Sequence, residues 1–225
     1  LCVCVVTRPA FAVLSINIDR GNVDPLPIAL PFGGSDFDSG KEIGRKVVEL
    51  VQEDLVRSGL FRSINRRAFI QQIEGAKTLP QFASWRQVSA SALLTSGIST
   101  VTDKEFETEF RLWDVYAEKQ IAGKVFSTHH ENWRRVAHLI SDQVYHRLTG
   151  EEGYFDSRIV YVSESGPGLK RVKRLAIMDQ DGENHRYLTD GKDLVLTPRF
   201  SPSLQEVIYL SYRDGIPKVF IRNVD

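Results

Sequence analysis

The sequence is poor in cysteine and methionine and carries no net charge. It has two cysteines, Cys2 and Cys4, and one methionine among 225 residues. The 29 Lys and Arg residues balance 29 Asp and Glu residues. No bulk electrostatic attraction therefore draws the chain to nucleic acid or to anionic lipid. We expect no nucleic-acid partner, and an apolar content of 42% is enough for an ordinary globular core.

The motifs of three common enzyme classes are also missing. There is no G-x-S-x-G nucleophile elbow, no G-x-x-x-x-G-K-S/T phosphate loop and no H-E-x-x-H zinc pair. Adjacent His129-His130-Glu131 favours a surface or capping role, because neighbouring residues at a helix start seldom converge on one ion. Asp179-Gln180-Asp181-Gly182 lacks the later ligands of a calcium loop, which favours a hairpin turn. We expect a protein that is not an enzyme, with no catalytic residues, cofactor or metal.

An apolar stretch opens the sequence at Leu1, without an initiating Met, and leads into Ala10-Phe11-Ala12. A-x-A is the pattern of small residues that signal peptidase reads. We expect residues 1–12 to be the remnant of a secretory signal, and a buried N-terminal strand is the alternative. Cleavage after Ala12 leaves an exported chain without cysteine, and hence without a cysteine-based zinc site or redox pair.

The next part of the chain predicts an arm followed by an α/β domain. Alternation of Leu14, Ile16 and Ile18 with polar residues predicts an extended arm within residues 13–24. For residues 25–153 we expect strands near 27–32, 60–64, 92–98, 106–115 and 120–126, and helices ending at Gly59 and Gly150. This order predicts a mixed sheet with two main helices. Whether both helices cover the same face of the sheet stays open.

The C-terminal part contains a repeat. Two similar six-residue segments start 48 positions apart, at residues 158 and 206. They are Arg158-Ile159-Val160-Tyr161-Val162-Ser163 and Glu206-Val207-Ile208-Tyr209-Leu210-Ser211. Such a period is typical of β-propeller blades, which have roughly 40–50 residues. We expect residues 154–225 to be the first blade and part of the second, and the sequence to be a fragment. We also expect exposed apolar edges and poor solubility; the predicted edge residues are Val207, Tyr209, Val219 and Ile221.

Ordered pieces of the sequence resemble the TolB family of the Tol-Pal system of Gram-negative bacteria. They include residues 16–21 (Ile-Asn-Ile-Asp-Arg-Gly), 54–61, 112–115 and, most distinctively, the junction 148–159 (Leu-Thr-Gly-Glu-Glu-Gly-Tyr-Phe-Asp-Ser-Arg-Ile). The resemblance implies an N-terminal α/β domain followed by the start of a six-bladed β-propeller, truncated here. It also implies a non-enzymatic adaptor located in the periplasm.

The resemblance further implies protein partners. In that family the propeller binds the lipoprotein Pal and the N-terminal arm binds TolA, which supports outer-membrane integrity and envelope constriction at cell division. Some colicins use the same propeller face for import. Carried over position by position, the arm contacts are Ile16, Ile18, Asp19 and Gly21, and an extended arm suits addition to a partner's sheet.

Two other functions are compatible with the residues alone. One is a propeller-bearing serine peptidase whose catalytic domain is missing from this sequence. The other is a carbohydrate-binding propeller of the cell envelope. The lack of a catalytic motif together with the propeller repeat favours a binding module, because the loops at the end of a propeller commonly bind proteins or small ligands.

Overall fold

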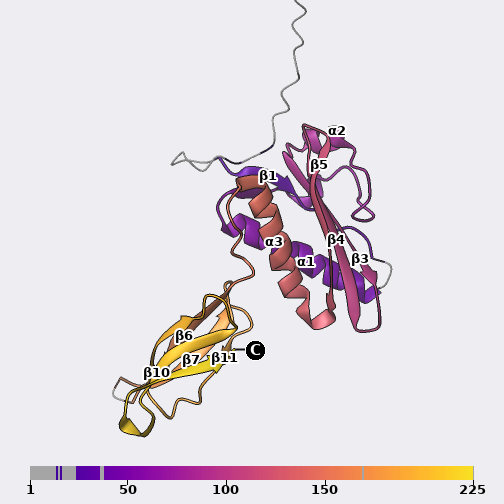
Figure 1. Ribbon diagram of the computed structural model, residues 1–225. Helices are drawn as coiled ribbons and strands as arrows, with labels where there is room; N and C mark the ends of the chain where they lie inside the picture. Colours follow the sequence, from indigo (N-terminus) through magenta and orange to yellow (C-terminus); the bar gives the residue numbers. More distant parts are fainter. Residues whose placement is uncertain (1–13, 15, 17–23, 36–37, 169, 225) are drawn as a thin grey trace, which may run out of the picture. The chain divides into compact units, whose positions relative to one another are not determined.

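In a computed structural model the chain divides into two compact units, residues 1–155 and 156–225 (Figure 1). The structure describes residues 14, 16, 24–35, 38–168 and 170–224. The sequence placed the domain limit after residue 153, and the unit boundary falls two residues later, after Phe155. Within these described ranges, no helix is both long and apolar enough to cross a lipid bilayer.

A five-stranded mixed sheet forms the framework of the first unit. Its strands are β1 (Leu26–Ala29), β2 (Phe61–Ser63), β3 (Ala92–Thr100), β4 (Glu105–Asp114) and β5 (Lys119–His129). They lie in the order β2-β1-β3-β4-β5. Strand β1 is parallel to β2 and β3, whereas β3, β4 and β5 form an antiparallel meander. The mixed sheet and the hairpin of its last two strands are confirmed.

Both long helices cover the same face of this sheet (Figure 1). They are α1 (Asp38–Arg57) and α3 (Trp133–Thr149), the latter preceded by the 3₁₀ turn η2 (His130–Asn132). One apolar cluster joins them to the strands and includes Leu55, Leu94, Phe110 and Ile140. Gly150 adopts a positive φ of 79° and ends α3, as predicted. The structure thus settles the question that the sequence left open.

The opposite face of the sheet is covered by a segment that the sequence did not predict. It contains the 3₁₀ turn η1 (Arg66–Ala68) and the short helix α2 (Phe82–Gln87). Trp85 of α2 is buried with Leu93 and Trp113, and its Nε1 donates to Gln71 Oε1 at 2.9 Å. Because six residues are too few for a clear helical period, tertiary packing, not local pattern, fixes this helix.

The second unit consists of two three-stranded antiparallel sheets. The first has the order β6-β7-β8, with β6 (Arg158–Ser165), β7 (Val172–Asp179) and β8 (Arg186–Tyr187). The second has the order β11-β10-β9, with β9 (Val195–Phe200), β10 (Glu206–Ser211) and β11 (Lys218–Asn223); η3 (Arg213–Gly215) precedes β11. The two sheets share one apolar cluster, which forms the core of this unit.

The repeated segments pair in the same way with the strand that follows each of them, although β6 is an edge strand and β10 is the central strand of its sheet. In β6, Tyr161 lies opposite Ala176 of the next strand along the chain, and in β10, Tyr209 lies opposite Phe220 in the same way. Both strands pair antiparallel with their successor and start 48 residues apart. This shared pairing with the next strand is what successive blades of a propeller show.

Side chains of the repeat alternate between a buried and an open face. Val207 and Tyr209 are buried against the first sheet, while Ile208 between them is 43% exposed. The prediction that Val207 and Tyr209 are exposed was wrong, because they face the preceding sheet. Val219 and Ile221 of β11 are exposed, as predicted.

Candidate functional site

Two residues of the expected arm, Leu14 and Ile16, pack against the first unit. Ile16 is 8% exposed and belongs to the main apolar cluster, and Leu14 is partly buried beside that cluster. The Ile16 N–H donates to the Leu148 C=O at 2.7 Å. The last carbonyls of a helix have no hydrogen-bond donor within the helix. Leu14 and Ile16, here called the arm root, provide such a donor at the C-terminal end of α3 through the Ile16 N–H.

Ile16, one of the four predicted contact residues of the arm, is thus engaged within the protein itself. The sequence predicted an extended arm that suits addition to a partner's sheet, whereas the Ile16 amide is paired within the protein itself. The other three predicted contact residues, Ile18, Asp19 and Gly21, lie outside the described residues. The structure therefore locates the root of the arm at α3, and the partner contacts of the arm stay a prediction.

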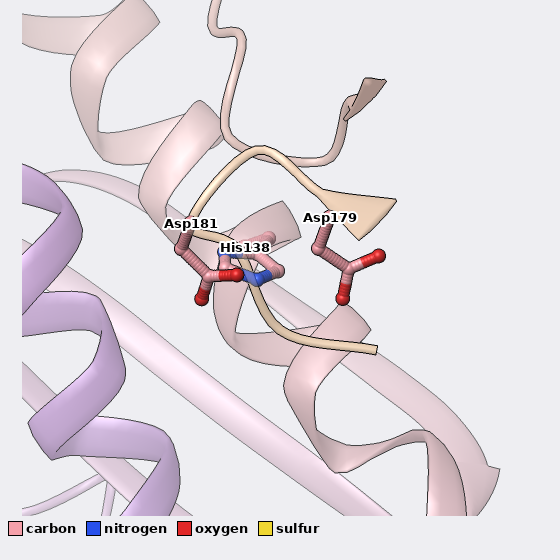
Figure 2. Close-up of side chains that lie close together, drawn as sticks. All are labelled: His138, Asp179 and Asp181. Carbon is pink, nitrogen blue, oxygen red and sulfur yellow. The ribbon is translucent and has the colours of Figure 1, made fainter. Parts of the chain in front are cut away.

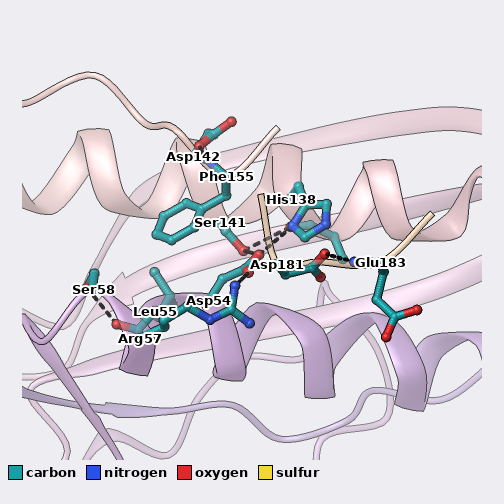
Figure 3. Close-up of polar contacts among 11 residues, drawn as sticks. Asp54, Leu55, Arg57, Ser58, His138, Ser141, Asp142, Phe155, Asp181 and Glu183 are labelled. Carbon is teal, nitrogen blue, oxygen red and sulfur yellow. Dashed lines mark hydrogen bonds and ion pairs between the residues drawn. The ribbon is translucent and has the colours of Figure 1, made fainter. Parts of the chain in front are cut away.

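The junction that follows α3 docks on the same helix (Figure 3). Phe155 is fully buried in the cluster that contains Ile16, and its N–H donates to Asp142 Oδ1 at 2.7 Å. A Cβ at Gly153 would lie 2.3 Å from the same oxygen, so no larger residue fits without displacing Asp142. The chain is thus fixed to α3 as far as Phe155.

An aromatic cluster reinforces this docking. Tyr154 and Phe155 stack with ring centroids 4.5 Å apart, and Tyr145 of α3 meets both rings edge-on at 5.7 Å. Burial raises the pKa of the Tyr154 hydroxyl above its usual value, with a smaller contribution from Tyr145. The distinctive junction motif of the sequence therefore serves first to anchor the end of the first unit.

A buried polar cluster links α1 to α3 beneath this junction (Figure 3). Asp54 of α1 is fully buried, and its Oδ2 lies 2.7 Å from His138 Nδ1 and accepts a hydrogen bond from Ser141 Oγ at 2.9 Å. Arg57 Nη1 lies 3.5 Å from the second oxygen, Oδ1. The carboxylate thereby connects two helices across the core.

The same three residue types form catalytic triads, but the arrangement differs. In a triad the histidine lies between the serine and the carboxylate. Here the serine and the histidine both contact the carboxylate, and Ser141 Oγ also lies 3.0 Å from the Ala137 C=O. The cluster is suited to holding helices together, not to activating a nucleophile.

Sequence reasoning missed this cluster. The available signal was Asp54, an ionisable residue that follows the buried Leu50 and Val51 by four and three positions and so lies on the apolar stripe of α1. Polar groups in such positions are normally paired.

The candidate metal ligands have other roles. His129 Nε2 is exposed 3.7 Å from Glu105, and His130 packs edge-on against Phe106. Figure 2 shows Asp179 and Asp181 at the turn after β7, where Asp181 Oδ1 accepts the Glu183 N–H at 3.1 Å. The hairpin-turn prediction is confirmed. His138, drawn in the same view, belongs to the first unit, so the three side chains define no metal site within either unit.

Comparison with known families decides the affiliation of the chain. The family described as TolB amino-terminal domain matches residues 14–121, and the family described as TolB beta propeller domain matches residues 145–225. The chain is a TolB-like protein. The crystal structure of TolB from Acinetobacter baumannii is similar, with a TM-score of 0.74 and 25% sequence identity. The match covers 94% of this chain and 50% of that chain, so the TolB-like protein spans half the length of that relative.

Two other solved structures resemble the TolB-like protein more remotely. The PelC dodecamer from Paraburkholderia phytofirmans has a TM-score of 0.37 and 13% identity, covering 57% of this chain and 89% of that chain. The LpoB C-terminal domain from Salmonella enterica has a TM-score of 0.35 and 11% identity, covering 47% and 82%. Similarity at this level carries no conclusion about fold or function.

The two domain matches confirm the predicted architecture, an α/β domain followed by the start of a propeller.

Proposed function

We propose that this TolB-like protein is a non-enzymatic periplasmic adaptor, which binds TolA through its N-terminal arm and Pal through its propeller. In this role it supports outer-membrane integrity and envelope constriction at cell division, and colicins use the propeller face for import. The observation that carries the proposal is the combination of the TolB amino-terminal domain and TolB propeller matches in one chain, with the arm root seated at α3.

The proposed arm contacts are Ile16, Ile18, Asp19 and Gly21. Binding of Ile16 by a partner requires the arm root to leave the core and to give up its hydrogen bond to Leu148. Full burial of an isoleucine side chain is worth about 1.5–3 kcal/mol, and burial in a partner's sheet offsets this loss.

The propeller contact is proposed for the loops at the end of the blades. Exposed apolar residues on the outer face of the second sheet, such as Ile208 and Ile221, suit the packing of a following blade better than a partner protein. Loops placed on a rigid scaffold commonly carry binding residues. The Pal-binding surface is therefore expected outside these sheet faces.

Deletion of residues 13–20 from the full-length protein tests the arm. Calorimetric titration with TolA should show no binding, while titration with Pal stays unchanged. Because the deletion also removes Ile16 from the core, a second variant, Asp19→Ala, keeps the arm root and should still weaken TolA binding. An exposed carboxylate elsewhere in the α/β unit, changed in Asp103→Ala, is the matched control. Unaltered TolA affinity after the deletion would defeat the arm assignment.

A further inference from the structure

A shallow pocket of about 580 Å³, lined mostly by polar and charged residues, lies at one edge of the sheet in the first unit. Helix α1 contributes Glu49 and Gln52, and residues 63–67, from the end of β2 into η1, contribute the remaining lining. Strand β2 is an edge strand, because β1 is its neighbour on one side and no strand of the described chain pairs with its other side. The pocket therefore borders an open strand edge.

The backbone of β2 presents hydrogen-bonding groups along this edge. The Ile64 N–H donates to the Ile28 C=O at 3.1 Å, so the backbone of Ile64 faces β1. Because backbone groups of successive strand residues point alternately to the two edges, those of Phe61 and Ser63 face outward. Such a row of donors and acceptors is a template for an added strand.

Two arginines stand at the end of the open edge. Arg66 Nη1 is 3.5 Å from Glu49 Oε1, a long contact, and the buried Arg66 Nε and Nη2 have no hydrogen-bond partner in the described chain. Asn65 Oδ1 accepts the Arg67 N–H at 2.9 Å and fixes the turn that carries both guanidinium groups. Two positive charges against one negative charge leave the pocket cationic. Guanidinium groups bind carboxylates with paired hydrogen bonds.

We propose that this pocket binds an extended, acidic peptide segment of a partner protein. The segment pairs with the outer edge of β2 and places a carboxylate on Arg66 and Arg67. Backbone pairing provides affinity for any extended chain, and the two arginines select a negatively charged one. This site lies within the α/β unit and is independent of the arm and propeller contacts proposed above.

The open edge of β2 and the two arginines together indicate which kind of molecule binds in the pocket. A small anion would use the arginines but leave the outward-facing groups of Phe61 and Ser63 without partners. A lipid surface needs a protruding apolar patch, whereas Ile64 is the one apolar residue that lines this pocket, and it is buried. An extended peptide with a carboxylate satisfies both the strand edge and the charge.

Nuclear magnetic resonance titration of the ¹⁵N-labelled chain tests the proposal. The probe is an N-acetylated tetrapeptide with alternating valine and threonine residues and a C-terminal aspartate. The amide resonances of Phe61 and Ser63 should shift in a saturable manner. The variant Arg67→Gln should weaken binding at least about tenfold, since a hydrogen bond to a charged group is lost. Arg67 is exposed, so the fold of the variant should be intact, and its melting temperature verifies this.

Three controls define what overturns the proposal. Arg222→Gln removes an exposed arginine of the second unit and should leave the affinity unchanged. A peptide with amides in place of both carboxylates should bind to the wild-type protein as weakly as the unmodified peptide binds to the Arg67→Gln variant. Inorganic phosphate serves as the anion-only probe. If phosphate shifts the Arg66 and Arg67 signals while the peptide leaves Phe61 and Ser63 unmoved, the pocket is an anion site without strand pairing and the proposal fails. It fails equally if millimolar peptide causes no shift.

Discussion

The two units of this TolB-like protein differ in how completely they cover their sheets. In the α/β unit, α1 and α3 cover one face and α2 with its loops covers much of the other. In the second unit the two sheets cover each other on one side only, and Ile159 and Ile208 on the outer sides remain 41% and 43% exposed. The first unit is closed by its own chain, whereas a propeller sheet needs a neighbour on each side.

Position in the repeat explains this exposure. Ile208 of β10 corresponds to Val160 of β6, which packs toward the second sheet, so Ile208 points toward the place of a third sheet. Ile159 corresponds to Val207 and points the opposite way. The same sequence pattern is thus buried or exposed according to which neighbours are present, and no property of the isolated strand distinguishes the two cases.

The largest expected effect concerns the closed unit. Phe155→Ala should lower the free energy of unfolding of the α/β unit by about 3–5 kcal/mol, because it leaves a cavity in the core next to α3. All three tryptophans, Trp85, Trp113 and Trp133, lie in this unit, so tryptophan fluorescence in urea reports on it alone. Tyr154→Ala is the control, because Tyr154 is half-exposed and its removal should lower the free energy of unfolding by less. If Phe155→Ala leaves the stability of the α/β unit unchanged, the junction does not belong to that unit.

The second-largest expected loss of stability follows from a substitution in the buried polar cluster of Asp54, His138 and Ser141. Asp54→Ala leaves His138 and Ser141 without their shared acceptor, and we expect a loss of about 3 kcal/mol in the same fluorescence experiment. Glu53→Ala changes the exposed carboxylate beside it on α1 and should alter the stability by less than about 0.5 kcal/mol. Equal effects of the two substitutions would mean that the cluster contributes nothing beyond a surface charge.

Adjacent residues of β10 provide a direct contrast within the open unit. Val207→Ala should destabilise the second unit by about 2 kcal/mol, whereas Ile208→Ala should cost less than about 0.5 kcal/mol in this chain. Hydrogen exchange of the β10 amides measures both. In a longer protein that carries the next blade, the effect of Ile208→Ala should rise to match that of Val207→Ala. If it does not, the outer face is not a blade interface.

The smallest expected effect is a pH dependence at the junction. Burial raises the pKa of Tyr154 in the folded state above its unfolded value, so the unfolded state loses its proton first as the pH rises. The stabilisation is complete below a pH of about 10, the unfolded pKa, and declines as the pH rises through the folded pKa. Tyr154→Phe should flatten this decline in urea titrations at pH 8 to 11. An identical slope in the two proteins would assign the decline to other groups.

Several features of the fold were predicted correctly because they depend on neighbours along the chain. The spacing of apolar residues from Val47 to Leu55 follows one face of a helix, and Gly150 ends the second helix through its positive φ. The Asp181-Gly182 turn and the 48-residue repeat are likewise visible in the sequence. The features that escaped prediction depend on residues far apart: Trp85 with Gln71, Asp54 with His138, and Ile16 with Leu148.

The sequence by itself determined that an α/β layer precedes a propeller repeat, because periodicity, turn residues and recurrence are local properties of the chain. Only the tertiary structure decided that both long helices share one sheet face, that the arm root is buried at α3, and that Val207 is covered while Ile208 is not. The physical reason is that burial and pairing depend on which distant surfaces meet, and a helical or strand pattern specifies an apolar face without specifying what covers it.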